Sequence, residues 1–365
     1  MAPLLSICIP TYNRAELLKS ALLSVMAQVK DFEGEVELVI SDNCSTDDTR
    51  EVVEWAGQFG PLRYHRNDEN IGAIPNILAL ADNLAAGEFC WLLGDDELLR
   101  PGAVAKVVGI LKAHPELDYV YVNYSVDSFD RREGKFVTPD DFREWTRTGN
   151  GRLEERRVER WEELLAEDSN CLTAMYCSVF RRSMWLKASR ELKKGELYSS
   201  VEWTYTPTIF FAKTMVGKPA WSTGYPWIIV CSKESWSDFI PVVMLLRFHE
   251  LLEVLNKNGV DERFLDQHRR EMLIRSETYL AEVFRGRRAQ RLESFSVTKF
   301  LARHYRYSES WRAIYSALLS VPLKVEFATS PAYAASAAVA RAVFRCLRLG
   351  RKVRARLRRS SSFAG

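Results

Sequence analysis

The hydrophobic positions of the first 125 residues follow two alternating patterns. Short apolar runs bounded by Gly, Pro or polar residues predict buried strands, and apolar residues spaced three and four apart predict amphipathic helices. Because the two kinds of segment alternate, we expect βαβ units and a mainly parallel sheet flanked by helices. The strands are expected at 4–9, 36–40, 62–65, 88–93 and 118–122, and the helices at 15–29, 48–59, 75–85 and 101–113.

The pattern changes after the fifth expected strand. Residues 125–160 are polar and carry many mixed charges, which predicts an insertion or a loop. Residues 161–235 combine short helical and strand-like pieces with many aromatic side chains. The chain is therefore expected to have an α/β fold followed by a mostly helical C-terminal region. Its helices are expected at 237–257, 262–284, 288–305 and 309–320.

The charge of the chain is concentrated at its C-terminal end. The formal net charge is +3, yet the residues after Glu326 include nine basic side chains and no acid, which leaves 42 basic against 48 acidic residues in the body. Arg341, Arg345, Arg348, Lys352 and Arg356 recur every three or four residues. Such spacing is typical of a basic amphipathic helix that binds an anionic membrane surface, here over 341–359. A disordered solubilising tail is the alternative, and we expect no nucleic-acid partner because no readout module accompanies the basic run.

Cysteine usage and hydropathy indicate the compartment. Seven cysteines are scattered along the chain without a CxxC pair, which favours reduced thiols over disulfides or a zinc site. No stretch reaches the roughly 18 uninterrupted apolar residues that a membrane span needs, and the first apolar run is too short for a signal peptide. We expect a cytoplasmic protein, with the basic tail allowing peripheral binding at the inner face of the cytoplasmic membrane.

The most informative local pattern is a buried strand that ends in acids. The apolar run 89–93 is followed by Gly94, Asp95, Asp96 and Glu97. In open α/β sheets, ligands bind outside the carboxyl ends of the strands. Adjacent carboxylates repel one another unless a cation neutralises them, and hard oxygen ligands favour Mg²⁺ or Mn²⁺. A solvated acidic turn before a helix is the alternative interpretation.

Three further loops carry polar and aromatic residues near strand ends. The loop 10–14 follows the first expected strand, the loop 41–47 follows the second, and the loop 70–73 leads into the helix that contains Asn76. Together they offer an aromatic ring, amide groups and a carboxylate beside the acid pair. That combination suits a nucleoside diphosphate, whereas any one of these loops alone would be explained as a turn.

The ordering of these motifs resembles that of the family-2 glycosyltransferases of the GT-A fold. The resemblance is carried by residues 7–14, 39–47, 70–72 with Asn76, and 92–96. It implies a Rossmann-like GT-A domain and inverting transfer of a sugar from a nucleotide sugar to an acceptor hydroxyl, assisted by Mn²⁺ or Mg²⁺. The expected domains are a donor-binding half at 1–125, an acceptor-binding half at 126–236, a helical region at 237–325 and a basic tail at 326–365.

The resemblance also implies roles for individual residues. Pro10 and Tyr12 match the segment that contacts uracil, and Asp42 matches the carboxylate that accepts the N3–H of the base, which favours a UDP or dTDP donor. Asp95 matches the acid that holds the ribose, and Asp96 the acid that ligates the metal. The family motif often has another acid two places before this pair, where the chain has Leu93. The remaining donor-binding residues are expected to be Thr11, Arg14, Asn70, Gly72 and Asn76.

Inversion requires a general base on the acceptor side. The best positional match is Glu202, although the family usually has Glu-Asp where this chain has Glu202-Trp203. Adjacent aromatic residues would strengthen such a base, and Trp203 is a candidate to stack on a sugar ring. Glu202 as a simple helix-face acid is the alternative, and Asp168 and Glu196 are weaker candidates for the base. Candidate cations for the leaving diphosphate are Lys233 and Arg247.

These expectations lead to one function and one alternative. The function is a glycosyltransferase that acts on a glycan or lipid-linked glycan during assembly of a bacterial surface polysaccharide such as an O-antigen or capsule. The alternative is a catalytically silent protein of the same fold that binds nucleotide sugars or serves as a scaffold. The presence of both Asp95 and Asp96 favours the enzyme.

Overall fold

The computed structural model describes residues 2–127, 154–167, 173–231, 237–285, 292 and 295–320. The chain divides into two compact units, each with its own internal contacts. Unit 1 comprises residues 1–235 and 254–265, and unit 2 comprises residues 236–253 and 266–365. The basic tail that the sequence suggested lies outside the described residues.

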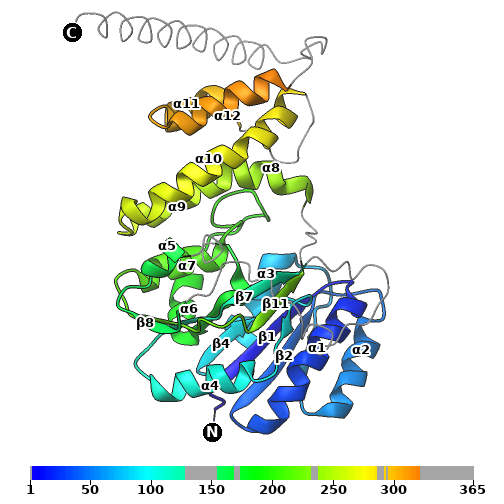
Figure 1. The fold of residues 1–365 in the computed structure, drawn as a ribbon. Helices are drawn as coiled ribbons and strands as arrows, with labels where there is room; N and C mark the ends of the chain where they lie inside the picture. Colours follow the sequence, from blue (N-terminus) through cyan, green and yellow to red (C-terminus); the bar gives the residue numbers. More distant parts are fainter. Residues whose placement is uncertain are drawn as a thin grey trace, which may run out of the picture. The chain divides into compact units, whose positions relative to one another are not determined.

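The centre of unit 1 is a mixed sheet with a parallel core (Figure 1). Strands β1, β2, β3 and β4 pair in parallel in the order β3-β2-β1-β4. Strand β9 then pairs antiparallel with both β4 and β6, and β10 and β8 complete the sheet. The bounds are β1 Leu5–Thr11, β2 Val36–Asp42, β3 Arg63–Arg66, β4 Phe89–Leu92, β6 Tyr119–Tyr121, β8 Arg156–Val158, β9 Ser178–Arg181 and β10 Ala220–Ser222.

A smaller sheet continues directly from the acidic turn. Strand β11 (Ile228–Cys231) pairs antiparallel with β5 (Leu98–Leu99) and parallel with β7 (Tyr124–Asp127). Because β5 starts immediately after Glu97, this three-stranded sheet fixes the C-terminal side of the acidic turn. The N-terminal side is fixed by β4, so the turn is anchored at both ends.

The helices of unit 1 form because their apolar positions recur with helical spacing. In α1, Leu18, Leu22 and Val25 are fully buried on one face. Helix α1 packs against α2 and α4, whereas the π-helical turn 80–84 that continues α3 packs against α6, which packs against α7. The bounds are α1 Ala15–Val29, α2 Thr49–Ala56, α3 Ala73–Ala79, α4 Ala103–Ala113, α5 Glu163–Glu167, α6 Arg182–Ser189 and α7 Thr206–Met215.

An aromatic cluster holds the second half of unit 1 to the sheet. The rings of Phe180 on β9 and Trp185 on α6 stack with centroids 4.8 Å apart, and Phe210 packs edge-on to Trp185. Phe211 contacts both Phe180 and Tyr119. These rings are almost completely buried, so the aromatic residues of 161–235 mainly form core.

Unit 2 is helical. Its core is formed by side chains such as Leu273, Leu280, Phe300 and Ile314. The described helices are α8 Ile240–Val242, α9 Phe248–Lys257, α10 Glu262–Phe284, α11 Val297–His304 and α12 Ser308–Leu319, and a π-helical turn at 243–247 joins α8 to α9. The turn between α9 and α10 belongs to unit 1.

The sequence predictions agree closely with the parallel core and less well elsewhere. The α/β class with a helical C-terminal region is confirmed, and α1 has the bounds that periodicity predicted. The third C-terminal helix begins at Val297, later than expected. Cys8, Cys44, Cys90 and Cys177 are free thiols. None of the helices in the described part of the chain combines the length and apolarity that a membrane crossing requires.

Candidate functional site

The expected loops meet at one edge of the main sheet. Strand β1 lies between β2 and β4 and runs parallel to both. Thr11 at the end of β1 is in register with Asp42 at the end of β2, and the Leu93 amide donates to the Cys8 carbonyl across the β1–β4 boundary. The sheet topology therefore brings the loops after β1, β2 and β4 together, as the sequence predicted.

The acid pair is held by a guanidinium group. Arg14 donates from Nη1 to Asp95 Oδ1 at 2.6 Å and from Nη2 to Asp96 Oδ2 at 2.7 Å. The hydroxyl of Thr11 donates to the other Asp95 oxygen at 2.8 Å. Burial raises the pKa of the Asp95 carboxyl above its ordinary value, and the adjacent Arg14 opposes part of that rise. The pair is thus a buried carboxylate and a partly exposed one that share a single cation.

The third acid of the turn is folded back onto the backbone. The Glu97 side chain is buried, and a Cβ placed on Gly94 would lie 1.9 Å from its Oε2 atom. Position 94 therefore accepts no side chain unless Glu97 moves. The solvated acidic turn considered from the sequence is not observed, because Asp95 and Glu97 are both buried.

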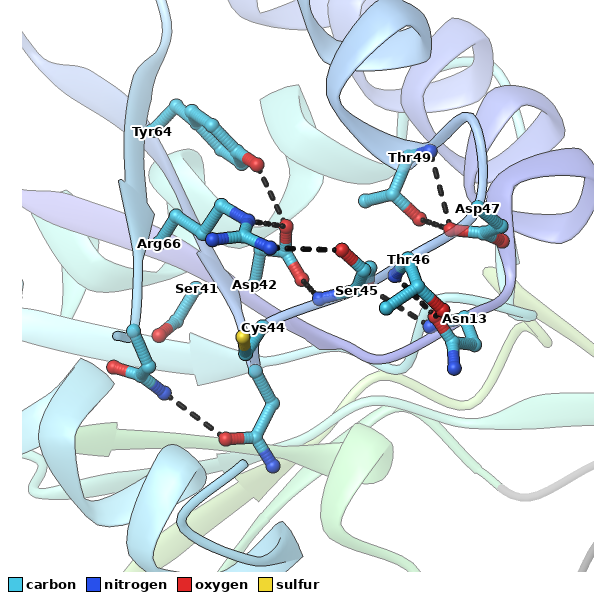
Figure 2. A network of polar contacts seen from close by, with 12 residues as sticks. Asn13, Ser41, Asp42, Cys44, Ser45, Thr46, Asp47, Thr49, Tyr64 and Arg66 are labelled. Atoms are coloured by element: carbon cyan, nitrogen blue, oxygen red, sulfur yellow. Dashed lines mark hydrogen bonds and ion pairs between the residues drawn. The ribbon is translucent and has the colours of Figure 1, made fainter. Parts of the chain in front are cut away.

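Asp42 is the centre of a polar network at the end of β2 (Figure 2). Its carboxylate accepts the Tyr64 hydroxyl at 2.7 Å and the Ser45 amide at 2.8 Å, and it pairs with Arg66 Nε at 3.5 Å. Burial and the neighbouring Asp42 carboxylate raise the pKa of the Tyr64 hydroxyl. Asp42 is only 1% exposed, so a base could reach it only if these contacts rearranged.

Asp47 links the loops after β1 and β2. One carboxylate oxygen accepts the Ala15 amide at the start of α1 at 3.0 Å, and the other accepts the amide and hydroxyl of Thr49 at the start of α2. A single side chain thus satisfies the N-terminal amides of two helices, as Figure 2 shows for Thr49. Asn13 adds a second link, because its side chain accepts the Thr46 amide at 2.7 Å.

Asparagine side chains fix the loop before α3. Asn76 donates to the Ser41 carbonyl at 3.0 Å and accepts from Asn67, which also donates to Asn43. Asn43 in turn donates to Asn70 at 2.8 Å. Asn76 is buried and its side-chain amide makes these hydrogen bonds. Its role in this structure is therefore to hold the loop in place.

The remaining donor-side residues frame the same edge. Tyr12 is 42% exposed and Ile71 is 38% exposed, although both are large and apolar. Pro10 is half-buried at the end of β1. Gly72 has a φ of +91° at the start of α3, a conformation that favours glycine. Two large apolar side chains are therefore exposed in the loops that follow β1 and precede α3.

The acceptor-side expectations are less well supported by the local structure. Glu202 is exposed, so it lacks the apolar surroundings expected for a strengthened base. Trp203 is buried, and its indole N–H donates to the Lys193 carbonyl at 2.9 Å, which makes it a packing residue. Glu196 is also exposed, and Asp168 and Lys233 lie outside the described residues. Arg247, which belongs to unit 2, is buried and pairs with Glu250 at 2.6 Å.

Sequence reasoning missed several residues that build this site. Tyr64 and Arg66 lie on β3 and contact Asp42 from the neighbouring strand. No motif marks them, and only the strand order β3-β2-β1 places them there. Asp47 had a signal, since it is an acid immediately before an expected helix, a position that favours capping.

Comparison with known proteins identifies what this arrangement resembles. Residues 6–183 match the family model "Glycosyl transferase family 2". The abequosyltransferase RfbV of Salmonella typhimurium is 43% identical over 104 residues, which are 28% of this chain and 31% of that protein. A Campylobacter jejuni GalNAc(5)-diNAcBac-PP-undecaprenol β-1,3-glucosyltransferase is 28% identical over 186 residues, or 50% of this chain and 53% of that protein. The matched parts thus span about a third and about half of these relatives.

Solved structures share the fold at low sequence identity. The first 349 residues of S. aureus TarS superpose with a TM-score of 0.50 at 16% identity, covering 88% of this chain and 82% of that chain. The same part of TarS in complex with UDP-GlcNAc gives a TM-score of 0.50 at 19% identity. Together with the family match, these likenesses establish a GT-A fold.

Proposed function

Residues 6–183 belong to glycosyl transferase family 2, and from this premise we propose that the protein is an inverting, metal-dependent glycosyltransferase. It moves a sugar from a nucleotide-sugar donor, of UDP or dTDP type, to a hydroxyl of a glycan or lipid-linked glycan. We extend the proposal to the assembly of a bacterial surface polysaccharide. The relatives are an abequosyltransferase and a β-1,3-glucosyltransferase named for a PP-undecaprenol-linked glycan, which supports a glycan or lipid-linked glycan as the acceptor.

The observation that carries this proposal is the convergence of Asp42, Asp95 and Asp96 at one edge of a parallel sheet. Strand β1 lies between β2, which ends at Asp42, and β4, which precedes the acid pair, and the loops after these three strands are cross-linked by Arg14, Thr11 and Asp47. This edge is where α/β sheets bind nucleotides. The exposed ring of Tyr12 lies in the same loop as Arg14 and offers a surface on which a base can stack.

The residues present fit a divalent cation. Asp96 is the partly exposed member of the acid pair, and its carboxylate offers hard oxygen ligands of the kind that Mn²⁺ and Mg²⁺ prefer. The described residues contain no group of three metal-binding side chains. A cation at Asp96 would therefore take most of its ligands from water and from the donor phosphates. Its role there would be to neutralise the charge of the leaving diphosphate.

The protein residues supply orientation and proton transfer. Asp95, fixed by Thr11 and Arg14, holds the ribose, and the loop of Asp42 reads the base. On the acceptor side, Glu202 takes the proton of the attacking hydroxyl as that oxygen forms its bond to the anomeric carbon and the bond to the diphosphate breaks. Its exposure leaves it open to an acceptor from solvent.

The test uses the full chain with a panel of nucleotide sugars. Transfer or hydrolysis should require Mn²⁺ or Mg²⁺, and UDP should raise the thermal unfolding midpoint only when metal is present. Asp96→Asn should lower turnover by about a hundredfold or more, the magnitude typical of losing one electrostatic contact to the developing charge. The control is Asp48→Asn, which changes an exposed acid outside these contacts. Nucleotide binding without turnover for any donor would favour the silent binding protein instead.

The general base and the tail have separate tests. Glu202→Gln should abolish transfer while leaving UDP binding intact, and surviving transfer would assign the proton to another group. Removal of 341–359 should reduce binding to vesicles that contain anionic lipid without changing turnover on a soluble acceptor, which would place the enzyme at the inner face of the membrane.

A further inference from the structure

The Arg14 side chain occupies an unusual position for a residue of a nucleotide-binding loop. Its two terminal nitrogens donate to two different carboxylates, Asp95 at 2.6 Å and Asp96 at 2.7 Å. Both partners lie more than 80 positions further along the chain. The guanidinium therefore spans the acid pair from the opposite loop and fixes the spacing of the two carboxylates.

The two carboxylates differ in how many of their oxygens already accept a hydrogen bond. Both oxygens of Asp95 already accept, one from Arg14 and one from Thr11. Asp96 gives one oxygen to Arg14, and its other oxygen, Oδ1, lies against Gly94. Asp95 is also the more deeply buried of the two, so a second cation reaches the pair more readily through Asp96, where it meets a positive charge already in place.

Two cations at one carboxylate compete. The described structure places the Arg14 guanidinium against the acid pair. The charges of all three acids of the turn raise the pKa of Arg14 and so favour its charged form. A divalent ion that approaches Asp96 is repelled by the charge of Arg14. It also competes with Arg14 for the lone pairs of the Asp96 carboxylate. If the ion arrives with a diphosphate, the added negative charge offsets that repulsion, and an N–H released from Asp96 gains a phosphate oxygen as its new acceptor.

We propose that Arg14 is a positioning residue that serves as the resident counter-cation of the acid pair. It holds Asp95 and Asp96 in place without metal, weakens the binding of a free divalent ion, and makes metal binding depend on the nucleoside diphosphate. This inference rests on the proposed function. It assigns Arg14 to the acids, whereas the sequence had placed it among the residues that touch the donor.

The experiment measures Mn²⁺ binding by calorimetry, with the ion alone and then with UDP present. In Arg14→Gln, Mn²⁺ alone should bind about tenfold more tightly than in the wild type, a typical size for coupling between two charged sites. The strengthening of Mn²⁺ binding by UDP should shrink correspondingly. Arg14→Lys keeps the charge but loses the two-pronged guanidinium that spans both carboxylates. It should therefore change the Mn²⁺ affinity and its strengthening by UDP in the same directions as Arg14→Gln, but by smaller amounts.

The control is Arg63→Gln. Arg63 also pairs with a carboxylate, that of Glu37 at 2.9 Å, but it lies on β3 and outside this pair. This variant should bind Mn²⁺ like the wild type. A merely structural Arg14 would give weaker or unchanged Mn²⁺ binding in both Arg14 variants, and that result would overturn the inference. If Arg14→Gln fails to fold, the Lys variant decides.

Asp96→Asn separates this inference from the proposed function. If Asp96→Asn abolishes Mn²⁺ binding but Arg14→Gln binds no more tightly than the wild type, only the inference about Arg14 fails. If Asp96→Asn binds Mn²⁺ as well as the wild type does, the metal site itself is wrong and both fail. A wild type that binds no Mn²⁺ even with UDP present would refute both the metal requirement and the dependence of metal binding on the diphosphate, whatever Arg14→Gln does.

Discussion

The carboxylates at the sheet edge of unit 1 and two histidines of unit 2 are both buried, but they are stabilised in opposite ways. Asp42 and Asp95 are buried, and each accepts two or more hydrogen bonds. His249 and His304 are fully buried with ring centroids 4.3 Å apart, and none of their ring nitrogens has a hydrogen-bond partner in the described structure. The hydrogen bonds of the first arrangement offset part of the cost of burying a carboxylate, whereas the second arrangement requires neutral imidazoles.

The cost of charging the histidines should appear as acid sensitivity. Burial, together with Arg269 and Arg303, lowers the pKa of His304 to about 3, and burial with His304 lowers that of His249. Because these values lie below that of an unfolded histidine, the unfolded chain binds more protons as pH falls below about 6.5, and stability falls with it. From pH 7 to pH 5 His304 alone should remove about 2 kcal/mol, and His249 acts in the same direction.

Urea denaturation at the two pH values measures this loss. His304→Phe should reduce the pH dependence, because the ring remains and the titration is lost. His65→Gln is the matched control, since His65 is exposed. An equal pH dependence of the unfolding free energy in the wild type, His304→Phe and His65→Gln would contradict the lowered pKa of the buried histidines.

The hydrogen-bonding role of carboxylates at this edge is tested at Asp47, which is exposed and caps two helices. Asp47→Ala removes the acceptor at the start of both α1 and α2, and should lower the free energy of unfolding by about 2 kcal/mol, since one cap contributes about 1 kcal/mol. Asp48→Ala is a neighbouring control, because Asp48 precedes α2 without a side-chain capping bond. Equal losses in urea denaturation for the two variants would contradict the double role of Asp47.

A smaller effect tests how tightly the acidic turn is packed. Gly94→Ala places a methyl group against the buried Glu97 carboxylate, and should destabilise unit 1 by about 1 kcal/mol and weaken UDP binding. Gly109→Ala provides a control of opposite sign. Gly109 lies inside α4 with open space around its Cα, so alanine there should stabilise by about 0.5 to 1 kcal/mol. A Gly94→Ala protein as stable as the wild type would show that the turn is free to adjust.

The sequence predicted the part of the structure whose information is local. The strands β1, β2 and β4 and helix α1 follow from apolar periodicity, and parallel pairing then places Thr11, Asp42 and Asp95 at one edge. Strand β9 was not predicted individually, because four residues with antiparallel partners give no distinctive period. The pairing of Arg14 with the acids was also not predictable, since it joins loops more than 80 residues apart. Glu202 was proposed as the base from motif position alone and stays a prediction, and its exposure could not be predicted from the neighbouring aromatic residues.

Strand β9 also determines the order in which the sheet can be completed. It lies between β4 and β6, although the ribosome makes it after both. Until residue 181 is synthesised, β4 and β6 have no partner on their facing edges, and bare edges are sites of aggregation. A nascent chain that stalls before β9 therefore exposes two unpaired strand edges that can aggregate, although β1, β2, β3 and β4, whose loops form the candidate site, are already synthesised.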